Sequence, residues 1–257
     1  MAGSLLMLAF LVLPTVVLVL RALRPEVYAS MYSPEALAAL RLSVMSTTIA
    51  VLLAVVLGTP LAYLLGCFRF RGRGALDAFV DLPLMLPPVI AGVGLLLVFG
   101  RQGLLGAPLA AAGITVGFTT TAVVLAQLLV ASPFFIRALK VGFANVPLEV
   151  QAAAMIDGAG RWGVFWRVCL PLAVPAFTEG LVLAWARALA EFGATIVFAG
   201  SLEGRTRTLP LAIYGAFEVG LDQAVAMAVL LTAFALLLFL ALRVLTRRTE
   251  PRAIFPT

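Results

Sequence analysis

Two groups of residues in this sequence have types and spacings that could do chemistry. Residues 158–163 read Gly-Ala-Gly-Arg-Trp-Gly, and the G-x-G-x-x-G spacing is typical of a turn that binds the pyrophosphate of a dinucleotide. Further along the chain, Arg187 and Glu191 stand four residues apart inside an apolar run. Groups at i and i+4 share one helix face, where opposite charges can neutralise each other. The function therefore depends on which elements position these two groups.

The composition indicates a membrane protein. Of the 257 residues, 63% are hydrophobic and 12% are charged, whereas about 25% are charged in a typical soluble domain. The net charge is +6, but the basic residues lie mostly between apolar runs, so we expect no nucleic-acid partner. The sequence has no histidine, and Cys67 and Cys169 are far apart in it, so no metal site, disulfide or cofactor is expected.

Six apolar runs are long enough to cross a bilayer, which takes about 20 residues as a helix. They are residues 4–20, 42–66, 80–100, 119–138, 176–200 and 223–245. We interpret the first run as a retained helix and not a secretory signal, because no basic residue precedes it. The chain, residues 1–257, is therefore expected to form one all-α transmembrane domain with six transmembrane helices.

The basic residues divide unevenly between the two sides of this topology. The larger set is Arg69, Arg71, Arg73, Arg137, Lys140, Arg161, Arg167, Arg243, Arg247, Arg248 and Arg252. The smaller set is Arg21, Arg24, Arg41, Arg101, Arg205 and Arg207. The positive-inside rule places the larger set, and with it both termini, in the cytoplasm.

The third apolar run contains Pro83, Pro87 and Pro88, which must interrupt the hydrogen bonds of a helix. Backbone groups freed at membrane depth are tolerated only when they are buried in protein or line a cavity. Two interpretations follow, a structural kink between packed helices or the lining of a pathway through the membrane.

The glycine spacing at 158–163 lacks the context that dinucleotide binding needs. That fingerprint follows a strand within a βαβ unit. Here the preceding residues 146–157 are rich in alanine and predict a helix, and apolar runs flank the region on both sides. We therefore exclude a dinucleotide site.

The segment 142–171 is instead expected to be a cytoplasmic helix–turn–helix, with helices at 147–156 and 162–170. We expect Gly158 and Gly160 to take left-handed conformations at the turn.

The second of these helices carries an apolar stripe. Trp162, Phe165, Trp166 and Cys169 follow the spacing i, i+3, i+4, i+7. Such a helix lies on the membrane with its aromatic side chains at the headgroups, or it docks into a groove of a partner protein.

The stretch AAAMIDGAGRWGVFWRVCLPLAVP resembles the EAA loop of the permeases of ATP-binding-cassette importers. The family pattern runs E-A-A, then D-G-A, then an aromatic residue and L-P. The resemblance implies a coupling helix that lies in a cleft of a cytoplasmic ATPase and transmits its nucleotide-driven closure to the membrane helices. The positions that match the motif are Asp157, Gly158, Ala159, Phe165, Leu170 and Pro171.

The leading glutamate of that pattern is missing. Counting back six residues from Gly158 gives Ala152, and Gln151 is one residue off. Glu149, one turn earlier, is the candidate to replace it. These three residues, with Gly160 and Trp162, complete the expected ATPase-coupling loop.

Three further segments resemble the molybdate, tungstate and sulfate permeases of that family. They are LPLMLPPVIAG with GRQGLLG after it, FTTTAVVLAQLLVASPFFIRALKVGF, and ARALAEFGATIVFAGSLEGRTRTLPLAIY. The E-F-G-A-T and G-R-T-x-T-L-P patterns of the last segment are more similar to molybdate and tungstate members than to sulfate members. The match covers about residues 42–248.

The resemblance implies a six-helix (MetI-like) permease in a bacterial or archaeal plasma (inner) membrane. It implies a homodimer with the transport path along the two-fold axis, a dimer of cytoplasmic ABC ATPase subunits, and an extracytoplasmic substrate-binding protein. The implied cargo is molybdate or tungstate, with sulfate or thiosulfate as the alternative.

Charged residues inside a span are costly, so Arg187 and Glu191 are functional candidates. They form either a structural ion pair in the dimer or bundle core, or a contact for the anion. Conduction requires release, so we expect tight cargo binding to reside in the binding protein. The other candidates for the translocation path or the dimer core are Pro87, Pro88, Gly193 and Thr195.

In the external segment that follows the fifth run, Arg205 and Arg207 have guanidinium groups that suit oxyanions. They steer the anion or dock its receptor, or they are solvated loop charges. Residues 209–217 after them are expected to form a short helix.

Two other functions compete with an ATP-driven importer. A proton- or sodium-coupled transporter would use Glu179, Arg187 and Glu191, but the spans show no inverted repeat. A membrane enzyme would have no histidine, clustered carboxylates or activated serine. The chain also has no G-x-x-x-x-G-K-[ST] motif to bind ATP. We therefore expect a permease, with ATP hydrolysis on a partner.

Overall fold

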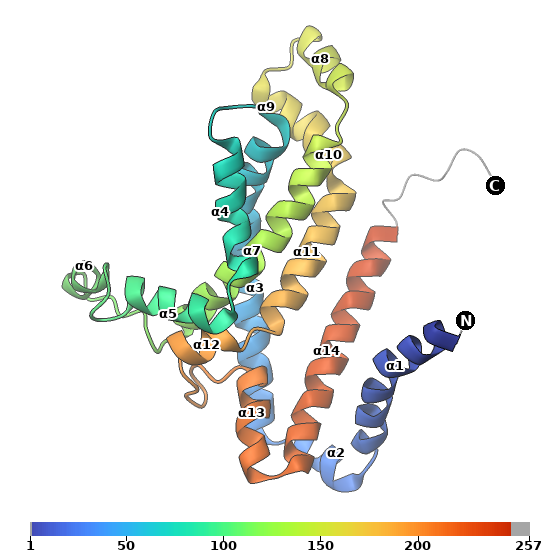
Figure 1. Ribbon diagram of the computed structural model, residues 1–257, viewed down its shortest axis with the longest axis vertical. Coiled ribbons are helices and arrows are strands. Elements are labelled where there is room, and N and C mark those ends of the chain that lie inside the picture. Colours follow the sequence, from blue (N-terminus) through green and yellow to red (C-terminus); the bar gives the residue numbers. More distant parts are fainter. Residues whose placement is uncertain (1, 248–257) are drawn as a thin grey trace.

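The computed structural model describes residues 2–247, which form helices and connecting loops without a strand (Figure 1). Three long helices form the centre of the bundle: α3 (Pro34–Cys67), α7 (Thr120–Ala144) and α11 (Val174–Leu189). α7 lies between the other two and packs along both. The expected all-α fold is confirmed for the described part of the chain.

Glycines allow close contacts between these three helices. A Cβ atom at Gly66 of α3 would lie 2.8 Å from Cβ of Phe143 on α7. A Cβ atom at Gly142 of α7 would collide with Cβ of Ala176 on α11. Lipid supplies no hydrophobic force between helices, so van der Waals contact at small residues holds them together.

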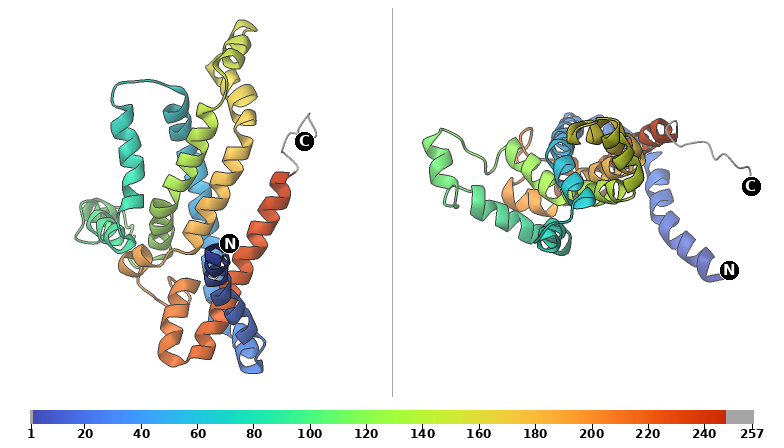
Figure 2. Two further views of the ribbon diagram at one scale, coloured as in Figure 1. Left: turned by 45° about the vertical axis from the view of Figure 1, so that its right-hand side comes forward. Right: turned by 90° about the horizontal axis from the view of Figure 1, so that it is seen from above.

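Four further helices, two long and two short, lie along one side of this bundle. They are α1 (Ala2–Ala22), α2 (Pro25–Met31), α13 (Leu209–Val219) and α14 (Leu221–Arg247). α13 is the short helix expected after the fifth run. α1 contacts α14 and α2, and its apolar stretch has no buried residue. Figure 2 shows α1 projecting away from the bundle.

Two of the expected spans are interrupted. The directions of α4 (Arg73–Met85) and α5 (Pro88–Phe99) differ by 113°, and the bend lies at the prolines that predicted a break. The run 176–200 was expected as one helix, and this is a correction: α11 ends at Leu189, and α12 (Gly193–Phe198) begins after a break. No proline stands at this second break, where the carboxylate of Glu191 accepts the N–H of Ala194 in the first turn of α12.

Four described helices, α1, α3, α7 and α14, are long and apolar enough to cross a membrane. Two bent pairs raise the number to six if each is one span: α4 with α5, and Arg161–Leu172 with Val174–Leu189. α3 begins earlier than the run at 42–66 because Ser33 caps it, accepting the N–H of Ala36 at 3.2 Å.

One end of the molecule carries α8 (Leu148–Ile156), and several basic segments meet there (Figures 1 and 2). α3 ends and α4 begins at this end, and α14 runs toward it. Arg248 and Arg252 lie outside the described residues. The backbone thus brings together most of the segments predicted to be cytoplasmic, while the orientation itself stays a prediction.

Candidate functional site

Residues 145–173 form a bent connection between α7 and α11, here called the elbow. It consists of α8, α9 (Arg161–Val164), the π-helical segment η1 (Phe165–Cys169) and α10 (Leu170–Leu172). The elbow lies beyond the ends of α7 and α11, at one extremity of the molecule (Figure 1). The predicted helix–turn–helix is present, but three short segments replace its second helix.

Gly158 ends α8 in a Schellman motif. Its φ is +88°, in the left-handed region that favours glycine. The N–H of Ala159 donates to the carbonyl of Ala154 at 2.9 Å, and the N–H of Gly158 donates to that of Met155 at 3.1 Å. These are the two hydrogen bonds that define the motif. The predicted left-handed conformation at Gly158 is confirmed.

The left-handed conformation predicted for Gly160 is wrong. Its φ of −66° and ψ of 171° are extended backbone, which any residue adopts, because Gly160 is the residue that precedes α9. No described atom lies within 4 Å of a Cβ built at either Gly158 or Gly160. The two glycines therefore have equal space and differ in backbone conformation.

Gln151 fastens α8 to the short segment that connects it to α7. Its Nε2 donates to the carbonyl of buried Val146 at 3.1 Å. Glu149 is exposed in the first turn of α8, where a negative charge is favourable to the helix dipole. Ala152 and Asp157 are exposed as well. Near the position of the missing glutamate, the side-chain amide of Gln151 therefore connects α8 to the residues that precede it.

Two prolines explain the bend between the elbow and α11. Pro171 has no N–H to donate to the carbonyl of Arg167, and Pro175 has none for that of Pro171. The helix breaks at Ala173, where φ is −88° and ψ is 0°. The helical directions before and after this residue differ by 70°.

The predicted apolar stripe does not form one buried face. Phe165 and Cys169 are buried, whereas Trp162 and Trp166 are 75% and 60% exposed. The i→i+5 hydrogen bonds of η1 widen the turn and shift the register expected of an α-helix. Phe165 packs edge-on against Tyr63 of α3 with ring centroids 4.8 Å apart, so it anchors the elbow to the bundle.

The outer surface of the elbow is apolar. Its exposed large apolar side chains are Leu148, Val150, Met155, Ile156, Trp162, Trp166 and Leu172, and Ile156 is 86% exposed. An exposed apolar patch of this kind marks a contact with another protein or with the membrane. Because the elbow caps one extremity of the molecule, a partner that approaches this end meets the patch first.

Arg187 and Glu191 form the ion pair that their spacing predicts. Arg187 Nη1 lies 2.7 Å from Glu191 Oε2, and the glutamate side chain is 1% exposed. Oε2 has no aligned hydrogen-bond donor among the described atoms, so the contact is charge pairing. Oε1 accepts the N–H of Ala194 at 2.7 Å and thereby caps α12. The carboxylate thus joins the end of α11 to the start of α12.

Gly193 and Thr195 lie in the joint between α12 and α5. A Cβ atom at Gly193 would lie 2.9 Å from Cβ of Pro88, so the two helices touch at this point. Thr195 is fully buried, and its hydroxyl has no partner among the described atoms. Pro87 precedes α5 in an extended conformation. Gly193 and Thr195 are thus buried within one chain, whereas Pro87 is exposed, and their assignment to the translocation path or the dimer core stays a prediction.

Comparison with known proteins agrees with this arrangement. Residues 55–254 match the family described as "Binding-protein-dependent transport system inner membrane component". The chain belongs to this family. The permease is 42% identical over 233 residues to the molybdenum transport system permease protein ModB of Mycobacterium tuberculosis, covering 91% of this chain and 88% of the relative. It is 39% identical over 218 residues to ModB of Escherichia coli K12, covering 84% and 95%.

The fold is also that of a solved transporter. The crystal structure of a bacterial ABC transporter involved in alginate import covers 98% of this permease and 94% of its own chain, with a TM-score of 0.78 and 18% identity. The expected family and fold class are confirmed. The chain is a multi-pass inner-membrane transport component and is not itself an enzyme.

Four charged residues of the permease form contacts that we did not predict. Lys140 Nζ lies 2.6 Å from Asp77 Oδ1, and Arg137 Nε lies 3.4 Å from Asp81 Oδ1. The pairs fasten α4 to α7 near the elbow, and α4 has no fully buried residue. The sequence did hold a signal for these contacts. The two aspartates stand at i, i+4 and so share one face of α4, and the two basic residues stand at i, i+3 and so share one face of α7.

Proposed function

We propose that this chain is the permease subunit of an ATP-driven importer for a tetrahedral oxyanion, molybdate or tungstate. Two copies form the transmembrane unit, a cytoplasmic ABC ATPase dimer binds beneath them, and an extracytoplasmic binding protein delivers the anion. Both relatives named above are molybdenum transport permeases, which supports this cargo. Sulfate or thiosulfate is the weaker alternative.

The elbow is the observation that carries the proposal. It presents an apolar outer surface, and the ring of Phe165 fixes it to Tyr63 of α3 and to Phe143 of α7. A partner that moves this surface therefore moves the ends of the central helices. The residues that would contact the ATPase are the exposed ones, Leu148, Ile156, Trp162 and Trp166, while Asp157, Gly158 and Ala159 hold the shape of the turn.

The orientation follows from the same proposal. If the elbow meets a cytoplasmic ATPase, the end of the molecule that carries α8 faces the cytoplasm. The positive-inside rule supports this side, because Arg69 and Arg71 lie in the connection between α3 and α4 at that end and Arg73 begins α4. Both termini are then cytoplasmic, and labelling of single cysteines added near each terminus in intact cells tests the assignment.

The structure offers little support for the ion-coupled alternative. Such a transporter needs a carboxylate that can take up and release a cation. Glu191 is nearly fully buried, and its two oxygens are committed to Arg187 and to the N–H of Ala194. The bundle-core interpretation gives this pair the role of fixing α11 against α12.

Replacement of Gly158 by valine tests the role of the elbow. A left-handed conformation costs an L-residue roughly 1–2 kcal/mol, so Gly158→Val opposes the turn, whereas Gly160→Val meets extended backbone and open space. We expect Gly158→Val to lower the ATP hydrolysis that the loaded binding protein stimulates, and Gly160→Val to leave it near the wild-type rate. Equal stimulation in both variants would contradict the proposal.

The cargo needs a separate measurement. Calorimetry of the cognate binding protein with molybdate, tungstate and sulfate compares three tetrahedral dianions on the polypeptide in which we expect selectivity to reside. We expect tight binding of molybdate and tungstate. Tight binding of sulfate alone would assign the permease to a sulfate importer.

A further inference from the structure

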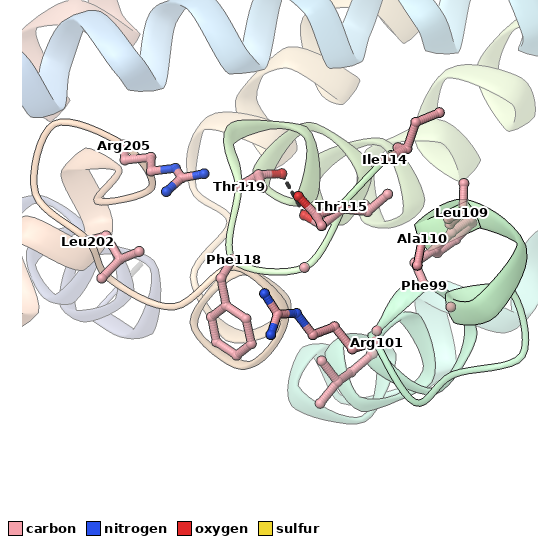
Figure 3. A pocket seen from close by; sticks show the side chains of 15 residues that line it. Phe99, Arg101, Leu109, Ala110, Ile114, Thr115, Phe118, Thr119, Leu202 and Arg205 are labelled. Atoms are coloured by element: carbon pink, nitrogen blue, oxygen red, sulfur yellow. Dashed lines mark hydrogen bonds between the residues drawn. The ribbon is translucent and has the colours of Figure 1, made fainter. Parts of the chain in front are cut away.

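A cavity of about 690 Å³ lies on the part of the molecule remote from the elbow. Its walls are the end of α5 with the loop to α6 (Gly106–Ala111), the segment that precedes α7, and the loop that follows α12 (Figure 3). The three walls come from separate parts of the chain.

Two guanidinium groups enter this cavity from different walls. Arg101 follows α5 and Arg205 lies in the loop after α12. Figure 3 shows the guanidinium of Arg101 beside Phe118 and that of Arg205 directed toward Thr119. Neither forms an ion pair with a carboxylate of the described residues, and no acidic residue lines the cavity. Arg207 differs, because its Nη1 lies 3.6 Å from Glu203 and its Nε donates to Ser201.

The walls are fixed relative to one another. Phe118 has a φ of +59°, which is strained for a residue with a side chain. Its N–H donates to the carbonyl of Phe198 at 3.2 Å, which connects this segment to α12. The hydroxyl of Thr120 donates to the carbonyl of Arg205 at 2.9 Å. The backbone that carries Arg205 is therefore tied to the start of α7 before any ligand arrives.

We propose that this cavity is a transient binding site for the transported tetrahedral oxyanion, which Arg101 and Arg205 hold as it leaves the binding protein. The inference rests on the function proposed above. Two guanidinium groups match the charge of a dianion, whereas a single carboxylate from a protein partner would neutralise one of them. Both arginines are exposed, so binding is weak and the anion is released onward, as conduction requires.

A cysteine in the cavity wall tests this site. Leu202 lines the cavity and is exposed, so Leu202→Cys in the complete permease–ATPase complex provides a reactive thiol. The complex is placed in nanodiscs of phosphatidylcholine, and the reaction rates with anionic sulfonatoethyl and cationic trimethylammonioethyl thiosulfonates are compared. The wild-type complex, whose Cys169 is buried and Cys67 half-buried, gives the background rate.

We expect the anionic reagent to react at least about fivefold faster than the cationic one, because two positive charges attract it. Millimolar tungstate should slow the anionic reagent, and chloride at the same ionic strength should not. Arg101→Gln with Arg205→Gln should abolish both the charge preference and the protection. Arg207→Gln is the matched control and should preserve them.

Three results would overturn the inference. The first is a charge preference that survives in the double variant, and the second is a lack of protection of the thiol by tungstate. The third is that free tungstate does not slow the anionic reagent, but unloaded binding protein or a lipid with an anionic phosphate headgroup does. Protection by tungstate is measured with both arginines present, so it does not depend on whether the double variant assembles.

Uptake of molybdate by the same wild-type complex separates this inference from the proposed function. If the complex imports the anion but tungstate does not protect the thiol, the cavity is not the site and the importer stands. If the binding protein and the complex handle no tetrahedral oxyanion, the proposed function is wrong, whatever the labelling shows.

Discussion

The two ends of α11 are both broken, but for different physical reasons. At the Val174 end, Pro171 and Pro175 lack backbone donors, so the covalent structure itself sets the bend. At the Leu189 end the chain turns where Glu191 accepts the N–H of Ala194 and pairs with Arg187. The first bend directs an apolar elbow outward, and the second closes a buried joint. A helix can thus end because a proline lacks the backbone N–H that would continue it. It can also end where a side-chain carboxylate accepts a backbone N–H of the next helix.

The buried joint should be the more sensitive of the two ends. Removing one partner of a buried ion pair costs about 3–5 kcal/mol, and the partial exposure of Arg187 lowers this for Glu191→Ala to roughly 2–4 kcal/mol. Thermal unfolding of the purified complex in nanodiscs measures the loss. Glu191→Gln retains an acceptor for the N–H of Ala194 and should lose less. Equal melting temperatures for the two variants would show that the cap contributes nothing.

The proline end should be sensitive to helix spacing. A methyl group at Gly142 would collide with Ala176 at the start of α11, and overpacking of this kind costs roughly 1–3 kcal/mol. We expect Gly142→Ala to lower the melting temperature of the complex. Gly94→Ala is the control, since Gly94 is also inside a helix but has open space. A loss as large in the control would mean that backbone effects, and not contact with α11, explain the result.

The smallest effect is expected within the elbow. Gln151→Ala removes one half-buried hydrogen bond to Val146, worth about 0.5–1.5 kcal/mol. Glu149→Ala changes an exposed residue that has no ion pair among the described residues, and should be neutral within about 0.5 kcal/mol. ATP hydrolysis stimulated by the binding protein should fall slightly in the first variant only. A larger loss with Glu149→Ala would instead make Glu149 the substitute for the missing glutamate.

The contrast between the ends of α11 also explains what the sequence could predict. Proline and glycine act locally, so the break at Pro87 and Pro88 and the left-handed turn at Gly158 were both predictable. The break after Leu189 was not, because it depends on Glu191 meeting an N–H that becomes free only when α12 has formed. The sequence showed that Glu191 could accept a hydrogen bond, but not that the N–H of Ala194 would lie within reach of it.

The site was predictable to a similar extent. The pairing of Arg187 with Glu191 followed from their spacing. The division of the aromatic stripe did not, because a π-helical turn begins at Phe165, which packs against Tyr63 of α3 while Trp166 stays exposed. Periodicity assumes a regular α-helix, and it fails where tertiary contacts change the number of residues per turn.

The most direct test of the account is the environment of Trp162 in the assembled complex. A photoreactive phenylalanine analogue at this exposed position should cross-link to the ATPase subunit, and the yield should change when nucleotide closes the ATPase dimer. The same analogue at Met85, an exposed residue at the far end of α4, should give no ATPase adduct. Cross-links from position 162 to lipid, with none to the ATPase, would contradict the central claim that the elbow couples the permease to its motor.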